Sequence, residues 1–301
     1  MSDRNPLKML AGAHRDMPAS RYHSMPGASA SRLRKLWQSS PAHLRVEMRK
    51  QVEPTPAMIL GTLAHHAVLE PEKPLPRLVV PPATYPAPSD SSLVKTKKVA
   101  VGDAVDWSWS ARFCKEWRRN LEAVGMMVVS QSTYDSTFGA AISVARHPIA
   151  GPLVADGDSE VSLLTWDETN DIGVRCRLDH VPPGRSLVDC KFTHDVTPRA
   201  FAKHAFEMGY HIQAALYLDV WNSLCGADEP KDQFVFIACE QSEPWAVNVF
   251  TCSPDFIELG RQHAAEMLAL FARCLREDRW PAYPEHVHTL SAPRWALKEA
   301  A

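Results

Sequence analysis

Two short apolar segments joined by a tight turn place the strongest constraint on how this chain can fold. Residues 174–192 read VRCRLDHVPPGRSLVDCKF, with apolar and charged residues alternating on both sides of the turn at 182–184. Such alternation is typical of β-strands, and Pro-Pro-Gly is typical of a turn. Because strand side chains point alternately to opposite faces, Asp189 and Lys191 share one face. A hairpin would also bring Asp179 beside them.

The resulting group of two carboxylates and one ammonium suits the hydrolysis of phosphodiesters. Carboxylate oxygens are preferred ligands of hard divalent cations, and a cation at such a site polarises a phosphate and acidifies water. Asp-x-Lys also occurs on solvated strand edges. The tripeptide alone therefore leaves that simpler interpretation open.

A helix-like segment follows the hairpin. It begins after Gly209 and reads YHIQAALYLDV, so that Gln213 and Tyr217 lie four residues apart and project from one side. The order of an Asp, then Asp-x-Lys, then Gln-x-x-x-Tyr resembles the PD-(D/E)xK nuclease superfamily. Within it, the resemblance is to the branch that contains the RecB nuclease domain and the phage exonuclease VIII type (RecE-type) enzymes.

Two adjacent histidines lie in a second informative segment, residues 55–72, which reads TPAMILGTLAHHAVLEPE. Its apolar run predicts a largely buried helix, in which imidazoles need partners. A hydrogen-bonded core histidine is the ordinary outcome, and periodicity does not choose between His65 and His66. The resemblance does choose, because the related enzymes carry Gly-Thr-x-x-His before an apolar run and Leu-Glu-Pro. His65 then matches the family histidine that lies beside the active-site metal.

The resemblance implies the α/β fold of restriction endonucleases, with a central mixed β-sheet flanked by helices and a mainly helical N-terminal part. We expect residues 1–28 to be loosely ordered, because they contain scattered Pro, Gly and Met without periodicity. Residues 29–156 are predicted to form the mainly helical part that carries the motif histidine. Residues 157–301 are predicted to form the nuclease core.

Residues 29–50 predict two short helices rich in Arg and Lys, the second opened by Pro41. A DNA-binding helix face and an ordinary solvated surface would both fit this composition. The related enzymes carry a similar Ser-Pro-Ala-His, here at residues 40–43. The Trp-Pro-x-Tyr at residues 280–283 and the Pro-x-Trp at 293–295 resemble them too.

The middle of the chain is less regular. Prolines are dense from residue 71 to about residue 92, which predicts a loop with at most one short strand near residues 78–80. Three lysines then precede an aromatic-rich segment through Trp107, Trp109 and Trp117, which we expect to be helical. Basic and aromatic residues together can bind single-stranded nucleic acid by stacking. Tryptophans at helical spacing are, however, more often core residues.

After Gly157 the pattern predicts strands. The first covers residues 160–166 and begins with Glu160, and two more lie on either side of residues 241–244. A long helix is predicted over residues 254–278.

The charge is unevenly distributed along the chain. Residues 1–120 hold 19 Lys and Arg against 10 Asp and Glu, and the remainder holds 14 against 25. A basic front and an acidic rear would suit a protein that grips phosphates with one part and binds cations with the other. An uneven solvated surface explains the same numbers.

The seven cysteines contain no Cys-x-x-Cys pair, which argues against a zinc ribbon and against clustered iron-sulfur ligands. The chain also lacks an apolar window of about 18 residues and a signal-peptide pattern. We therefore expect an intracellular protein that does not contact a membrane, and the resemblance implies the cytoplasm of a bacterial or phage-infected cell.

For the site, the resemblance implies a Mg²⁺-dependent nuclease in which Mn²⁺ can substitute. The residues expected to hold the metal are His65, Asp179, Asp189 and Cys190, the last through its carbonyl. Lys191 would position the attacking water and stabilise the transition state. Gln213 and Tyr217 would hold the phosphate or orient the Asp-x-Lys strand. Glu160 is a further candidate, as an outer carboxylate.

The implied activity is exonuclease digestion of linear double-stranded DNA, from 5′ to 3′, in phage-type recombination or DNA repair. The implied partners are DNA ends, a single-strand annealing protein and further copies of the chain in a ring. An endonuclease or nickase with the same metal site, and a non-catalytic DNA-end-binding module, are the alternatives. Many superfamily members carry Glu where this chain has Asp189, although Asp is frequent in this branch.

Overall fold

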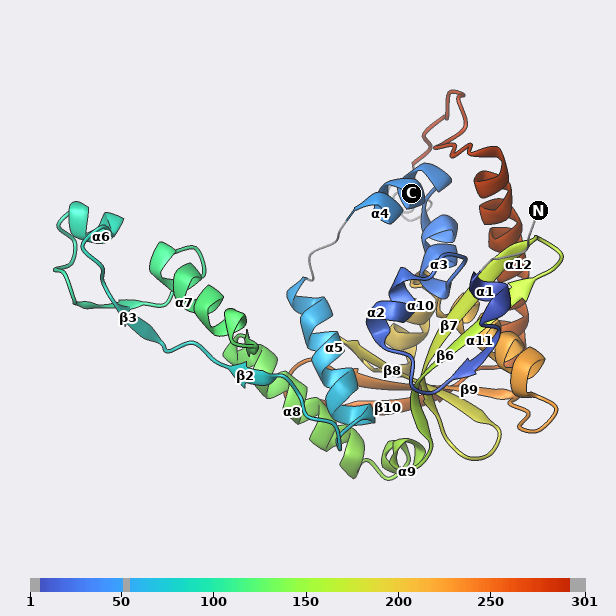
Figure 1. The fold of residues 1–301 in the computed structure, drawn as a ribbon, viewed down its shortest axis with the longest axis horizontal. Coiled ribbons are helices and arrows are strands. Elements are labelled where there is room, and N and C mark those ends of the chain that lie inside the picture. Colours follow the sequence, from blue (N-terminus) through green and yellow to red (C-terminus); the bar gives the residue numbers. More distant parts are fainter. Residues whose placement is uncertain (1–5, 51–54, 293–301) are drawn as a thin grey trace, which may run out of the picture.

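A six-stranded sheet carries most of the residues of interest (Figure 1). The computed structural model describes residues 6–50 and 55–292. In spatial order the strands are β1 (Gly12–His14), β6 (Asp158–Asp167), β7 (Ile172–Val181), β8 (Ser186–Thr193), β9 (Gln233–Glu240) and β10 (Val247–Thr251). Neighbours are antiparallel except β8 and β9, which run parallel. The predicted mixed sheet within an α/β fold is confirmed.

The predicted hairpin corresponds to β7 and β8. Its turn is anchored by Lys231, which is only 1% exposed and donates hydrogen bonds from Nζ to the carbonyls of Pro182 at 2.7 Å and Gly184 at 2.8 Å. Beyond the turn the two strands pair only at His180 and Val188. They therefore separate on the side where Asp179 and Asp189 lie.

Helices cover both faces of the sheet, as the alternation along β8 shows. Leu187 belongs to the main core, which is formed with α3 (Ala30–Gln38), α4 (Pro41–Arg49), α10 (Pro198–Glu207), α11 (Tyr210–Cys225) and α12 (Pro254–Glu277). Val188 and Cys190 belong to a second cluster, with α5 (Pro56–Leu69), α8 (Gln131–Arg146) and α9 (Ala150–Ala155). Successive residues of one strand thus point to opposite layers.

Helix α11 lies between the sheet and α12. Its sequence is apolar almost all round, which is typical of a helix that is buried on all sides. It begins at Gly209, whose φ of 68° is in the left-handed region. A Cβ there would lie 2.9 Å from Cγ of Arg34, so the start of α11 requires glycine both for its backbone and for the approach of α3.

The expectation of a loosely ordered N-terminus is wrong for residues 6–28. They contain α1 (Pro6–Met9), α2 (Ala19–Ser24) and strand β1, which extends the sheet by pairing with β6. Leu7 is 1% exposed and lies in a cluster with Tyr22 and Leu164. Elements this short span too few residues to show a periodic pattern in the sequence. Contacts with distant residues stabilise them instead. Residues 1–5 lie outside the described residues.

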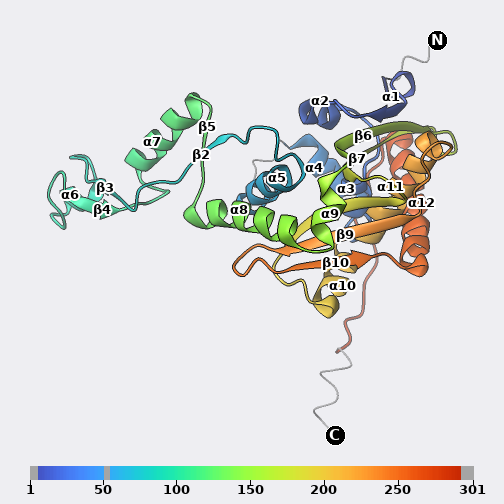
Figure 2. The ribbon, with the colours of Figure 1, turned by 90° about the horizontal axis from the view of Figure 1, so that it is seen from below.

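Residues 77–128 form a projection that we call the arm (Figures 1 and 2). It consists of β2 (Arg77–Val79), β3 (Thr84–Pro86), α6 (Ser92–Lys95), β4 (Ala104–Asp106), α7 (Arg112–Ala123) and β5 (Met126–Val128). Two predictions are corrected here. The proline-rich stretch contains a second strand, β3, because it pairs with β4. Helix α7 begins only at Arg112, so Trp107 and Trp109 precede it.

The strands and the long helix predicted after Gly157 match the structure closely. Glu160 lies near the start of β6, strands β9 and β10 flank residues 241–244, and α12 ends at Glu277. The Pro-x-Trp at residues 293–295 lies outside the described residues. Within the described ranges, none of the helices is long and apolar enough to cross a membrane.

Candidate active site

Three acidic residues occupy adjacent positions on β6, β7 and β8. Ser159 pairs with His180 and Val161 with Leu178, so the register sets Glu160 opposite Asp179. The backbone of Glu160 has a φ of 58°, and the strand pairing omits this residue. The His180 and Val188 pair likewise places Asp179 and Asp189 in neighbouring positions.

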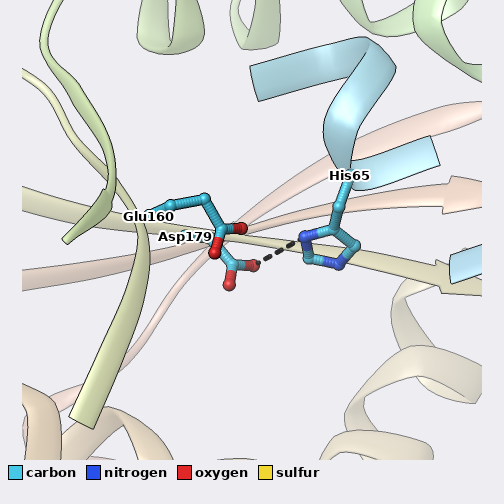
Figure 3. A group of neighbouring side chains, drawn as sticks. All are labelled: His65, Glu160 and Asp179. Carbon is cyan, nitrogen blue, oxygen red and sulfur yellow. Dashed lines mark ion pairs between the residues drawn. The ribbon is translucent and has the colours of Figure 1, made fainter. Parts of the chain in front are cut away.

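His65 completes this group from α5 (Figure 3). Its Nδ1 lies 3.4 Å from Oδ2 of Asp179. The ligand atoms of His65, Glu160 and Asp179 all lie within 4.8 Å of one another. Carboxylate oxygens and an imidazole nitrogen at this spacing fit a divalent cation such as Mg²⁺ or Mn²⁺.

The charges at the site also fit a cation. The pKa of Asp179 is raised well above its usual value, first by burial and then by the negative charges of Asp189 and Glu160. The pKa of His65 is lowered to about 4, first by burial and then by the charge of Lys191. The imidazole is therefore neutral at pH 7 and keeps a lone pair for a metal.

Asp189 and Lys191 form an ion pair beside this group. Asp189 is buried, and Gln213 of α11 donates a hydrogen bond to its Oδ1. Burial lowers the pKa of Lys191, but Asp189 and Asp179 outweigh burial and leave that pKa raised. Lys191 therefore remains an ammonium, with Nζ 4.7 Å from the ring centre of Tyr210.

A family profile matches most of the chain. The family is described as a PDDEXK-like domain of unknown function (DUF3799), and the match covers residues 29–293. The chain belongs to the DUF3799 family. Its PDDEXK-like assignment agrees with the mixed sheet and with the resemblance inferred from the sequence. No curated protein matches the chain.

Solved structures also match this chain. A protein named "putative exonuclease" from Eubacterium rectale has 11% sequence identity and a TM-score of 0.58, covering 96% of this chain and 99% of its own. A phage-related exonuclease from Haemophilus somnus has 12% identity and a TM-score of 0.32, covering 64% and 91%. An alkaline exonuclease from Laribacter hongkongensis has 11% identity and a TM-score of 0.25, covering 57% and 87%. At this identity the first similarity establishes the fold alone.

Most of the predicted site residues of this DUF3799 protein lie together. The side chains that meet at the divergence of β7 and β8 are those of His65, Asp179, Asp189, Lys191 and Gln213. Glu160, predicted only as an outer carboxylate, has an oxygen within 4.8 Å of the ligand atoms of both His65 and Asp179. Whether each residue acts as predicted stays a prediction.

Cys190 contributes its backbone to the site. Its amide donates a hydrogen bond of 2.9 Å to Oδ2 of Asp179, and the backbone of Cys190 also hydrogen-bonds His65. The thiol lies in the second core cluster, where burial raises its pKa well above the usual range. Cys190 is therefore placed to orient two of the candidate ligands.

Tyr217 is placed differently from Gln213. It lies in the main hydrophobic core, with its ring 6.3 Å from that of Phe234, and burial raises its pKa well above the usual value. Among the described residues, the tyrosine whose ring contacts Lys191 is Tyr210. The predicted role of Tyr217 in holding a phosphate therefore has no contact in support, although it packs the helix that carries Gln213.

Sequence reasoning missed Tyr210 and Arg34. Tyr210 lies three residues before Gln213, a spacing that puts both on one side of α11 and was a usable signal. Arg34 lies on α3, with Nη1 3.4 Å from Oε1 of Gln213, which also accepts from Lys191 at 3.4 Å. The basic composition of residues 29–50 was noted, but nothing local indicated that Arg34 faces α11.

Proposed function

We propose that this protein is a divalent-metal-dependent deoxyribonuclease that digests linear double-stranded DNA from its ends. The observation that carries the proposal is the group of His65, Glu160 and Asp179 beside the Asp189 and Lys191 pair, in a PDDEXK-like fold. A binding module would need neither several carboxylates at one point nor an ammonium next to them.

In the proposed mechanism the side chains have separate tasks. His65, Glu160, Asp179 and Asp189 would hold Mg²⁺ or Mn²⁺. When bound, the metal supplies Lewis-acid stabilisation of the phosphate and acidifies water. Lys191 positions the attacking water and offsets the negative charge that develops in the transition state.

Gln213 is a positioning residue. It donates to Asp189 and accepts from Lys191, so it fixes the direction of both side chains. Arg34 and Tyr210 add a second cation and a ring on the same side. This group is therefore suited to hold the polyanionic backbone of DNA against the metal ligands.

The resemblance to the exonuclease VIII type enzymes supports proposals on polarity, biological role and assembly. We propose 5′ to 3′ polarity and a role in phage-type recombination or repair in the cytoplasm, alongside a single-strand annealing protein. We also propose a ring-shaped homo-oligomer on the DNA. Sedimentation of the purified protein tests the ring, since a monomer at micromolar concentration would exclude it.

The experiment that separates the candidate functions compares two substrates. End-labelled linear duplex and covalently closed circular duplex of the same sequence are incubated with the protein and Mg²⁺ or Mn²⁺. The proposal predicts that linear duplex is degraded while closed circles stay intact. Opening of the circles would favour the endonuclease or nickase, and cutting of neither substrate would favour the binding module.

A matched pair of variants assigns any cleavage to this site. Asp179→Asn should reduce cleavage by at least about 100-fold, because the metal supplies several kcal/mol of charge stabilisation. Asp232→Asn changes an exposed carboxylate that pairs with Arg185 on the surface and should leave cleavage unchanged. Equal loss in both variants would point to a contaminating or remote activity.

A further inference from the structure

The arm is a folded unit that the proposed active site does not use. Four of its buried residues, Tyr85, Ala87, Val105 and Cys114, form a hydrophobic cluster of their own. The ring of Tyr85 stacks on Phe113 at 5.2 Å, and further aromatic side chains close the cluster. The arm therefore holds its own shape and projects from the sheet (Figure 1).

The arm is rooted beside the candidate active site. It leaves the chain after α5, the helix that carries His65, and returns to it through α8, which packs against α5. At its base β2 and β5 pair in parallel, and this pairing joins the outgoing and returning segments. DNA held at His65 would consequently pass near the root of the arm.

The far part of the arm carries unpaired positive charge. Lys95, Lys97 and Lys98 are exposed and lie within four residues of one another, around the α6 end that Figure 1 shows at the tip. In the part of the chain that the structure describes, none of the three forms an ion pair. By contrast, Arg112 and Arg118 of the same arm pair with Glu116 and Glu122.

The arm has a net positive charge, as do residues 1–76 before it, whereas residues 129–301 are acidic. Residues 77–128 hold eight Lys and Arg against five Asp and Glu, although the whole chain has a net charge of −2. A projection with a net positive charge favours a polyanionic partner.

The tryptophans of the arm argue against a stacking platform for single strands. Trp107 packs edge-on against Trp117 at 4.9 Å in the cluster of the arm, and Trp109 alone of the three has a largely exposed side chain, at 46%. Successive bases would find one accessible ring rather than a row of them. Lysine ammonium groups bind backbone phosphates without such rings.

We propose that the arm is a second DNA-binding element, whose lysines contact phosphates of the duplex outside the active site. The proposal rests on the proposed function, because it takes duplex DNA as the ligand. The arm then raises the affinity for duplexes long enough to reach its tip. It has no part in the chemical step.

The test uses a triple variant, Lys95→Gln, Lys97→Gln and Lys98→Gln, and a control with Arg112→Gln and Arg118→Gln. The control removes arm charges that are already ion-paired. Binding to a short duplex of about ten base pairs and a long one of about forty is measured by fluorescence anisotropy in EDTA across a salt series. Thermal melting confirms that the exposed substitutions leave the fold intact.

We expect the triple variant to bind the long duplex at least about tenfold more weakly, with the slope of log K against log salt reduced by about 2 to 3. The triple variant should bind the short duplex with an affinity close to that of the wild type. The control variant should bind both duplexes with affinities close to those of the wild type. An unchanged salt slope on the long duplex would overturn the proposal. A change in sedimentation of the triple variant without DNA would also overturn it, in favour of a contact between copies of the chain.

This test is separate from the test of the nuclease. If wild-type protein cleaves linear duplex but the triple variant keeps the wild-type salt slope, only the role of the arm fails. If the protein binds the long duplex through the lysines but cuts no DNA with either metal, only the nuclease fails.

Discussion

The Asp179 carboxylate is partly buried beside two other acidic groups, and this placement costs stability when no cation balances it. A carboxylate oxygen of Glu160 lies within 4.8 Å of the ligand atom of Asp179, although Arg177 forms an ion pair with Glu160. Asp189 and Glu160 both contribute to its raised pKa. Metal ligands typically repel one another in the metal-free protein and are stabilised when a cation binds. This gives a prediction that can be tested without DNA.

Asp179→Asn should stabilise the metal-free protein at pH 7, by on the order of 1 kcal/mol, because it removes one of the mutually repelling charges. The folded-state pKa of Asp179 lies above its unfolded value. Stability of the wild type therefore falls as the pH rises from about 4 through the raised pKa. The advantage of Asp179→Asn should disappear below about pH 4.

Thermal unfolding in EDTA, and again with Mg²⁺ or Mn²⁺, measures this difference. Divalent metal should raise the melting temperature of the wild type and do much less for Asp179→Asn. A variant that melts below the wild type at pH 7 without metal would contradict the electrostatic account of the site.

His65 and His66 provide a matched pair within one helix. His65 faces Asp179, whereas His66 lies near Glu70 and its Nε2 is 3.2 Å from the carbonyl of Lys73. His65→Ala should lose most Mg²⁺-dependent cleavage and fold normally. His66→Ala should keep cleavage and lose about 1 kcal/mol of stability. Cleavage assays and urea unfolding of both variants check this. The reverse pattern would mean that His66, and not His65, is the histidine beside the metal.

At the scale of elements, the hairpin and the helices were predictable and the N-terminus was not. Strands β7 and β8 follow a local period of two, and α5, α8 and α12 follow helical patterns with Pro or Ser at their starts. These signals reside in adjacent residues. Strand β1 and helix α1 depend instead on contact with β6, more than a hundred residues away, which a local pattern cannot show.

The same distinction applies to the candidate site. Strand alternation related Asp179, Asp189 and Lys191 to one another, and the resemblance to the PD-(D/E)xK superfamily implied their roles and that of Gln213. The position of Glu160 next to His65 depends on a left-handed backbone and on a register across two strands, neither of which its neighbours in sequence indicate. The contact of Arg34 with Gln213 depends on how α3 packs on α11.

The packing of the N-terminal segment gives a prediction about stability. Leu7→Ala should cost about 2 to 5 kcal/mol, because Leu7 is buried against Gly173 and the cluster under α2. Met9, in the same short helix, is 71% exposed, so Met9→Ala should cost less than about 0.5 kcal/mol. Urea unfolding compares the two. Equal, small effects would mean that residues 6–28 do not stabilise the fold.

At the scale of the whole molecule, three parts of the structure have separate tasks. The sheet and α11 position the candidate site residues, and α5 adds His65 from the other layer. The arm places positively charged lysines at a distance from this site (Figure 1). The central claim is that the site performs metal-dependent chemistry in which Lys191 acts on the reaction rather than on the metal. An ammonium has no lone pair to donate to a cation.

The most direct test is Lys191→Gln, which removes the positive charge and keeps a donor for Asp189. Mn²⁺ binding is followed by calorimetry, and hydrolysis of end-labelled linear duplex is followed in a single turnover. We expect metal binding to be retained while hydrolysis slows by about 100- to 1,000-fold, the range seen when one group that stabilises a transition state is lost. Hydrolysis at the wild-type rate, or loss of Mn²⁺ binding with cleavage retained, would contradict this expectation.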